Sequence, residues 1–97
     1  MVKRSLALLF ILIFFSFSLF GCHYFSAKKE IANAGKLLSE LKGAGGEKQV
    51  PYEYCSAEKF LEAANIEFGQ NDFGPAKGFA ERSKSAAQAG LSEIGKK

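Results

Sequence analysis

Residues 50–94 read VPYEYCSAEKFLEAANIEFGQNDFGPAKGFAERSKSAAQAGLSEI and contain two apolar stripes separated by a short break. The first stripe consists of Tyr54, Ala57, Leu61, Ala64 and Phe68, and the second of Phe73, Ala76, Ala80, Ser83, Ala87, Gly90 and Ile94. Steps of three and four residues place each stripe on one face of an α-helix. Because the break at residues 69–72 is so short, the two helices must run antiparallel, and residues 51–94 are predicted to form a helical hairpin.

Both predicted helices begin with residues that favour a helix start. Pro51 fits a first turn, where its missing N–H costs no hydrogen bond, and Asp72 is a good N-cap for the second helix. Along the stripes Ala alternates with larger side chains, so the small residues let the helices approach each other. The core of such a hairpin is thin, and we expect a first helix, a partner chain or the membrane surface to add stability.

A further helix is predicted upstream, over residues 27–42. Its stripe is Ala27, Ile31, Ala34, Leu38 and Leu41. Ser26 is the expected N-cap and Gly43 the expected stop. Residues 43–50 are rich in glycine and lack periodicity, so they are predicted to form a loop. The expected fold class is therefore all-α, with an N-terminal signal helix followed by a three-helix module.

The N-terminus has the order of a secretory signal peptide. Lys3 and Arg4 precede residues 6–20, which carry no charge. As a helix of ~1.5 Å per residue this run is shorter than the ~30 Å hydrocarbon core of a bilayer. The competing interpretation is a retained single-pass anchor, because no charge occurs between Ser5 and Ala27.

The end of this segment, Leu19-Phe20-Gly21-Cys22, resembles the lipobox of bacterial lipoprotein precursors, although Phe20 departs from the small or β-branched residue usual there. The resemblance implies that residues 1–21 are removed between Gly21 and Cys22. It also implies a diacylglycerol on the Cys22 thiol and an acyl group on its amino nitrogen, with no other cofactor. Residues 22–26 would then form a lipid-anchored tether. By the same resemblance, His23 in place of Asp after Cys22 favours the outer membrane, facing the periplasm.

The hairpin sequence carries a second resemblance. The resemblance rests on the Pro51-Tyr52-Glu53-Tyr54 start, the Asn71-Asp72-Phe73 turn and the Ala-rich second helix. They resemble a family of small bacterial envelope lipoproteins with a helical domain of unknown function, over about residues 31–91. The spacing is also similar to one tetratricopeptide unit, but no second copy follows. The family resemblance implies a scaffold role beside outer-membrane or peptidoglycan-associated proteins.

Size, charge and composition argue against several classes of function. Without residues 1–21, 76 of the 97 residues remain, with 11 of the 13 basic residues and all 10 acidic ones, which is too balanced for a nucleic-acid-binding protein. A chain of that size hardly builds the walled cleft of an enzyme. His23 is the only histidine, so no metal site is expected.

The other residues that could take part in catalysis or ligand binding are interpreted as packing or solvent-exposed residues. Cys55 is interpreted as a small packing residue, and the alternative is an intermolecular disulfide in an oxidising periplasm. Glu58 and Glu62 share a helical face but miss the apolar stripe, so they are predicted to be solvated rather than catalytic. The glycines before Lys48 lack the Ser or Thr that a phosphate-binding loop needs after its lysine.

These observations predict a non-catalytic, lipid-anchored envelope protein that binds membrane lipid through Cys22. Its helical module would contact an envelope protein, a peptidoglycan-associated partner or a second copy of the chain. The partner-binding candidates are Tyr52, Phe79 and Leu91, which lie off the predicted stripes. The alternative functions are a single-pass membrane-anchored protein and an envelope redox protein using Cys55.

Overall fold

The chain folds into helices joined by short connections. The computed structural model describes the backbone of residues 2–96 and the side chains of residues 3–14 and 23–96. In chain order the helices are α1 (Val2–Gly43), α2 (Gly46–Gln49), α3 (Pro51–Gly69) and α4 (Phe73–Lys96). No strand occurs between residues 2 and 96, and the all-α prediction is confirmed.

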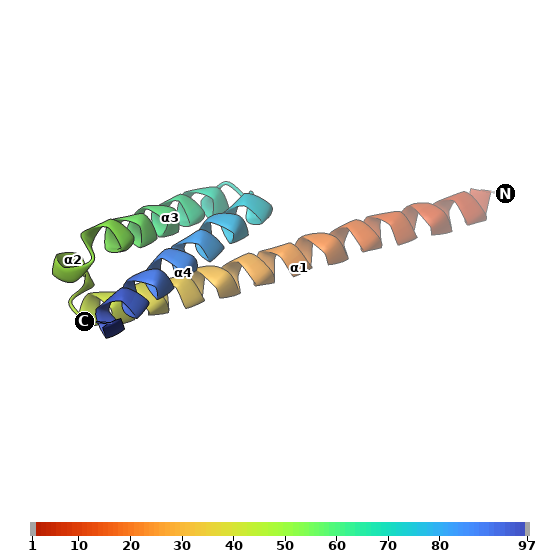
Figure 1. The fold of residues 1–97 in the computed structure, drawn as a ribbon. Helices are drawn as coiled ribbons and strands as arrows, with labels where there is room; N and C mark the ends of the chain where they lie inside the picture. The colour runs from red at the N-terminus through yellow and green to blue at the C-terminus, as the bar shows by residue number, and fades with distance from the viewer. Residues whose placement is uncertain (1, 97) are drawn as a thin grey trace.

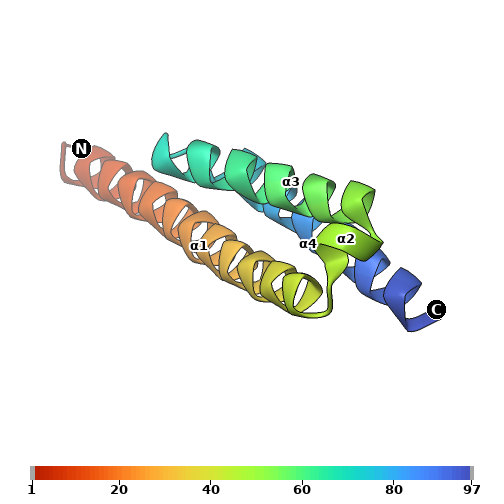
Figure 2. The same cartoon turned by 90° about the vertical axis from the view of Figure 1, so that its left-hand side faces the viewer.

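The C-terminal half of α1 packs with α3 and α4 into a three-helix bundle (Figure 1). The N-terminal part of α1 extends out of this bundle as a single helix, and the molecule measures 71 × 21 × 14 Å. The view turned by 90° shows α3 and α4 beside the C-terminal half of α1, with α2 at the end where α1 stops (Figure 2). The turn between α3 and α4 therefore lies at the opposite end, where the extension leaves the bundle.

The bundle core is built mainly from alanine. Ala34, Ala64 and Ala80, one from each long helix, are fully buried and form one cluster. Nearer α2, a second cluster contains Leu41, Val50, Ala57 and Ala87. The small side chains allow the helices to pack closely, and the larger members of the stripes fill the space at the edges. All three predicted stripes face the core, and α1 supplies the additional packing that the hairpin was expected to need.

Two glycines make room for Leu41, the largest fully buried hydrophobic side chain. A Cβ on Gly46 would lie 2.5 Å from Leu41 Cγ. On Gly90 it would lie 2.9 Å from Leu41 Cδ1 and 3.2 Å from Glu53 Cβ. All three distances are shorter than an ordinary carbon–carbon contact of ~3.5–4.0 Å. The absence of side chains at Gly46 and Gly90 therefore lets Leu41 fill the α2 end of the core.

Two polar interactions join the helices across the bundle. The buried Ser83 hydroxyl of α4 donates a hydrogen bond of 2.6 Å to the Ala57 carbonyl oxygen of α3. Lys84 Nζ of α4 lies 2.9 Å from Glu30 Oε2 of α1, and both side chains are largely shielded from solvent. Ser83 is thus accommodated on an otherwise apolar stripe because its hydroxyl has a partner.

The turn between α3 and α4 is closed by a Schellman motif. The Asp72 N–H donates to the Glu67 carbonyl oxygen at 2.9 Å, and the Asn71 N–H donates to that of Phe68 at 3.1 Å. Asn71 has φ 64°, in the left-handed region. The predicted helix starts agree with this arrangement, because α3 begins at Pro51 and Asp72 directly precedes α4.

Asn71→Ala is expected to lower the free energy of unfolding by about 1 kcal/mol, because a Cβ without a polar group disfavours left-handed backbone. Asn71→Gly should retain or raise the stability, since glycine adopts this conformation without steric cost. Urea unfolding followed by circular dichroism measures both changes. Gln70→Ala, at a residue with φ −92°, is the control. Equal stability of Asn71→Ala and the unchanged chain would contradict this explanation of the turn.

The structure corrects the predicted beginning of the first helix. A separate helix beginning at residue 27 with Ser26 as N-cap is wrong, because α1 runs without a break from Val2 to Gly43. The expected tether at residues 22–26 is also helical. Proline is missing from this part of the sequence, and an isolated glycine such as Gly21 lowers helix stability by only ~1 kcal/mol. The predicted stop at Gly43 is confirmed, and the loop at 43–50 contains the single turn α2.

Candidate functional site

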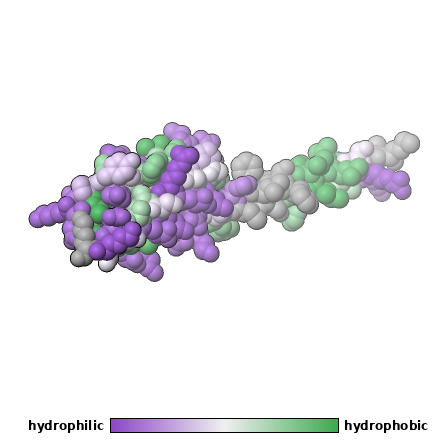
Figure 3. Space-filling model, viewed as in Figure 1, coloured by the Kyte–Doolittle hydropathy of each residue, from purple (hydrophilic) through white to green (hydrophobic). Residues whose placement is uncertain are grey.

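The extension of α1 carries exposed apolar side chains. Those of its large hydrophobic residues between Leu6 and Phe14 are 47–75% exposed. Hydrophobic surface gathers on this extension, outside the bundle (Figure 3). Among the described residues, no helix offers a stretch that is both long and apolar enough to cross a membrane. Gly21 and Cys22, the predicted processing and lipid-attachment residues, lie on the backbone of α1, but their side chains lie outside the described part of the structure.

An aromatic cluster lies where the extension enters the bundle. We call Tyr24, Phe68 and Phe73 the junction cluster. The ring centre of Tyr24 lies 5.2 Å from that of Phe68 and 5.3 Å from that of Phe73, and the second contact is edge-to-face at 89°. The ring centres of Phe68 and Phe73 lie 5.2 Å apart across the α3–α4 turn. Such geometries are favourable for aromatic pairs, so the cluster fixes α1 to both other helices at this end.

Sequence reasoning missed the junction cluster because residues 22–26 were interpreted as a tether. The signal was present, since Tyr24 lies three residues before Ala27 and continues the stripe of the first helix. Phe68 ends the α3 stripe and Phe73 begins the α4 stripe. Their position on either side of a tight turn places both rings at one end of a hairpin, where Tyr24 meets them.

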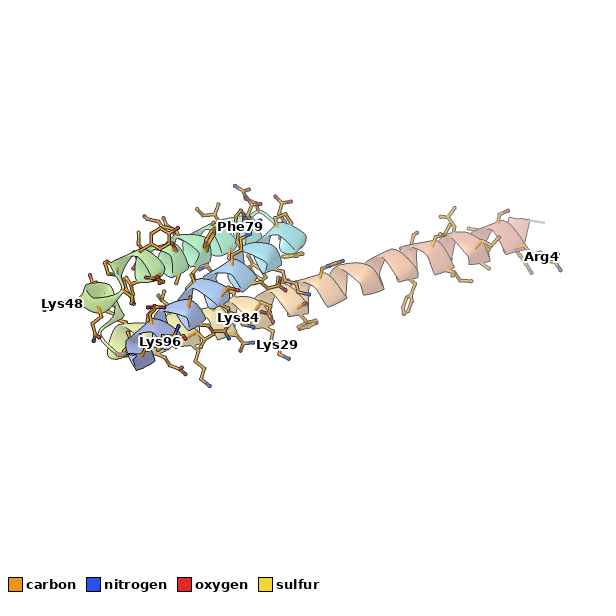
Figure 4. All side chains as sticks on the ribbon, viewed as in Figure 1. Arg4, Lys29, Lys48, Phe79, Lys84 and Lys96 are labelled. Atoms are coloured by element: carbon orange, nitrogen blue, oxygen red, sulfur yellow. The ribbon has the colours of Figure 1, made fainter. Side chains whose placement is uncertain are left out.

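Apolar and basic groups on the outside complete this end of the bundle. Phe25 contacts Tyr24 at 5.4 Å between ring centres and is 70% exposed. Ile66, in the last turn of α3, is 54% exposed. Lys28 Nζ lies 5.9 Å from the Tyr24 ring centre, in the range of a cation–π contact. Figure 4 shows Lys29 on the same part of α1, and Lys48 at the opposite end, on α2.

The predicted partner-binding residues differ in exposure. Tyr52, in the first turn of α3, is 79% exposed, as a partner-binding residue should be. Phe79 and Leu91 are partly buried, and each packs against one of the core clusters. The expectation that the core leaves Phe79 and Leu91 exposed is therefore wrong. The buried face of α4 is wider than the predicted stripe, and it includes Phe79 and Leu91, which are next to Ala80 and Gly90.

A stacked group on the α3 and α4 surface was not predicted. The Phe60 and Phe79 rings are 6.4 Å apart and nearly parallel, and the Arg82 guanidinium lies 5.9 and 5.8 Å from their centres. A pocket of about 240 Å³ adjoins this group and is lined by Pro75, Gly78, Phe79 and Arg82. Its sequence signal was Arg82 three residues after Phe79, which places both on one helical face.

The isolated chemical candidates all lie on the surface. Cys55 is exposed, so its interpretation as a packing residue is wrong. His23 is exposed, and Glu58 and Glu62 are exposed as predicted. Within residues 3–14 and 23–96, no group of three His, Cys, Asp or Glu side chains could hold a metal ion.

The α3–α4 turn brings two carboxyl groups together. Partial burial, a hydrogen bond with the Asp72 side chain and the charge of Asp72 raise the pKa of Glu67. The folded protein therefore holds the Glu67 proton more tightly than the unfolded chain does. Stability from this pair is fully present below the ordinary pKa of 4.5 and is lost as the pH rises through the raised value.

Glu67→Gln is expected to raise the melting temperature at pH 7 and to change it little at pH 3. The amide cannot ionise, and its NH₂ group can still donate a hydrogen bond to Asp72. Thermal unfolding at a series of pH values measures the difference. Glu81→Gln removes an exposed carboxylate of α4 far from the turn and should show no such dependence on pH. An equal effect of Glu67→Gln at pH 3 and pH 7 would show that the carboxyl pair does not control stability.

No protein-family model matches the chain, and no match is found among curated proteins or solved structures. Function is therefore inferred from the sequence of the N-terminus and from the geometry of the bundle.

Proposed function

We propose that this chain is the precursor of a bacterial envelope lipoprotein, anchored to a membrane through lipid on Cys22, with a non-catalytic helical module. One observation carries the proposal. Every buried hydrophobic residue in the described part of the chain lies at Ala27 or beyond. Cleavage between Gly21 and Cys22 would therefore remove the exposed apolar residues 6–14 and keep every buried hydrophobic residue of the described part.

Lipid on Cys22 would replace the apolar segment as the membrane attachment. Each buried methylene contributes about 0.8 kcal/mol, and stable attachment needs more than one acyl chain. A diacylglycerol on the thiol with an acyl group on the amino nitrogen meets that need. By the resemblance to lipoproteins of Gram-negative cells, the site of attachment is the outer membrane, with the module in the periplasm.

The module would act by binding rather than by catalysis. Two groups on its surface are suited to a protein or peptidoglycan-associated partner. Tyr52 is exposed next to α2, and the stack of Phe60, Phe79 and Arg82 adjoins the pocket on α4. Aromatic residues and arginine are the side chains that most often contribute strongly to protein interfaces.

Cysteine variants of the full chain in a bacterial host test the proposal. With the unchanged chain, we expect recovery in the membrane fraction and incorporation of a labelled fatty acid. Cys22→Ala should abolish the label and prevent cleavage. Cys55→Ala is the matched control and should keep both the label and the membrane location. Labelling that depends on Cys55, or no labelling of the unchanged chain, would contradict the proposal.

The exposure of Cys55 favours one alternative, an envelope redox protein that forms an intermolecular disulfide. Non-reducing electrophoresis of the membrane fraction tests it. A Cys55-dependent adduct, together with loss of cellular function in Cys55→Ser, would favour this alternative over a binding module. A retained single-pass anchor is the other alternative, and it would show an uncleaved chain that carries no label.

A further inference from the structure

The end of the bundle nearest Cys22 has a surface unlike the rest of the module. Phe25 and Ile66 come from different helices, and both are exposed there. The junction cluster lies beside them and joins α1, α3 and α4. Phe and Ile contribute apolar surface, whereas Tyr24 combines an apolar ring with a polar hydroxyl, as is common at the boundary between lipid and water.

The connection between Cys22 and this surface is short and helical. The backbone of α1 is continuous through residues 22–26, and Tyr24 packs against Phe68 and Phe73. Ala27 is fully buried in the bundle. A lipid on Cys22 would therefore be attached to the end of a packed helix, which restricts how far the bundle can turn away from the bilayer.

The charges at this end are mixed. Lys28 and Lys29 are exposed on α1, and Lys28 lies over the Tyr24 ring. Glu67 and Asp72 add carboxyl groups at the α3–α4 turn. Because the two signs are both present, apolar insertion rather than attraction to anionic lipid would supply the contact. A bilayer of neutral phosphatidylcholine should be sufficient for binding.

From this geometry we infer that the end of the bundle formed by the junction cluster, Phe25 and Ile66 rests in the lipid headgroup region, so that the module stands upright with α2 and Tyr52 farthest from the membrane. The occupant of this surface is the lipid bilayer itself. The inference rests on the proposed function, because attachment at Cys22 brings the surface to the membrane. It goes further because it assigns lipid contact to Ile66, which lies on α3, whereas Cys22 lies on α1.

Single-tryptophan variants test the orientation, since the natural chain contains no tryptophan. Phe25→Trp, Ile66→Trp and Tyr52→Trp are made in the full chain, processed in a bacterial host and reconstituted into phosphatidylcholine vesicles. Part of the lipid carries bromine near the headgroup end of its acyl chains, which quenches tryptophan by contact. Gln70→Trp, at an exposed position in the α3–α4 turn, replaces Ile66→Trp if that variant loses its helical circular dichroism.

The expected result is loss of most of the emission from the tryptophans at positions 25 and 66, and full emission from the one at position 52. Quenching at position 25 alone would overturn the inference, because the bundle would then hang away from the bilayer. Quenching at all three positions would also overturn it, because the bundle would lie flat. Failure of the proposed function differs from both: the unchanged chain would carry no acyl group and would not remain with the vesicles.

Discussion

Replacing Leu41 with alanine is expected to lower the free energy of unfolding of the bundle by about 2–5 kcal/mol, the range for a buried leucine that leaves a cavity. Leu41 is fully buried and belongs to the cluster with Val50, Ala57 and Ala87. Its side chain fills the space left by Gly46 and Gly90. Its buried neighbours Ala57 and Ala87 are too small to fill the cavity, and the larger side chains packed against the cluster would have to leave their own positions to do so.

Urea unfolding in detergent micelles, followed by circular dichroism, measures this effect. Ile66→Ala is the matched control, since Ile66 is 54% exposed and the loss should stay within about 0.5 kcal/mol. A bundle of this size has only a few kcal/mol of stability to lose, so Leu41→Ala should be partly unfolded at 37 °C. A midpoint like that of Ile66→Ala would mean that Leu41 is not central to the core.

Ala80→Leu is expected to destabilise the bundle by about 1–3 kcal/mol or more, because adding carbon atoms to a packed core forces side chains and backbone to shift. Ala80 is fully buried in a cluster with Ala34 and Ala64, so all three long helices meet at this level. A leucine there would push α4 away from both partners. The expected effect is therefore opposite to the usual gain from adding apolar volume.

Ala89→Leu is the control for this substitution, because Ala89 lies on the same helix and is exposed. Both variants add the same atoms to α4, and leucine and alanine are both good helix formers. Comparison of their melting temperatures separates core packing from helix propensity. Similar melting temperatures for Ala80→Leu and Ala89→Leu would be incompatible with close packing of the three helices.

The hairpin was predictable from sequence because its stripes are regular. Ala57, Ala64, Ala76, Ala80 and Ala87 lie at helical spacing, and all are buried. The helix starts at Pro51 and after Asp72 are set by the local chemistry of these residues, and the packed structure keeps both of them. Ser83 was placed on the stripe by spacing alone, and its bond to the Ala57 carbonyl explains how a hydroxyl is accommodated there.

The start of the first helix was not predictable in the same way. Ser26 is a residue that often caps helices, but a cap is needed only where a helix ends. The residues before it contain no proline to break the helix, and α1 continues through Ser26. Whether Tyr24 belongs to a tether or to the core depends on Phe68 and Phe73, which are distant in sequence.

The candidate sites show the same division between local and tertiary information. Tyr52 was identified because it lies off the stripe, and in the first turn of α3 it stays exposed. Phe79 and Leu91 also lie off the stripe, but neighbouring helices partly cover them. Cys55 was expected to pack because a catalytic thiol would need a histidine base nearby, yet its position on α3 faces solvent.

The mass of the N-terminal peptide from the membrane fraction is the most direct test of the lipoprotein proposal. The full chain is expressed in a bacterial host, the membrane protein is digested, and the acylated peptide is analysed by mass spectrometry. We expect a peptide that begins at Cys22 and carries two or three acyl chains. A peptide beginning at Met1 or Val2, with an unmodified Cys22, would contradict the proposal and would leave a retained anchor with a second free thiol.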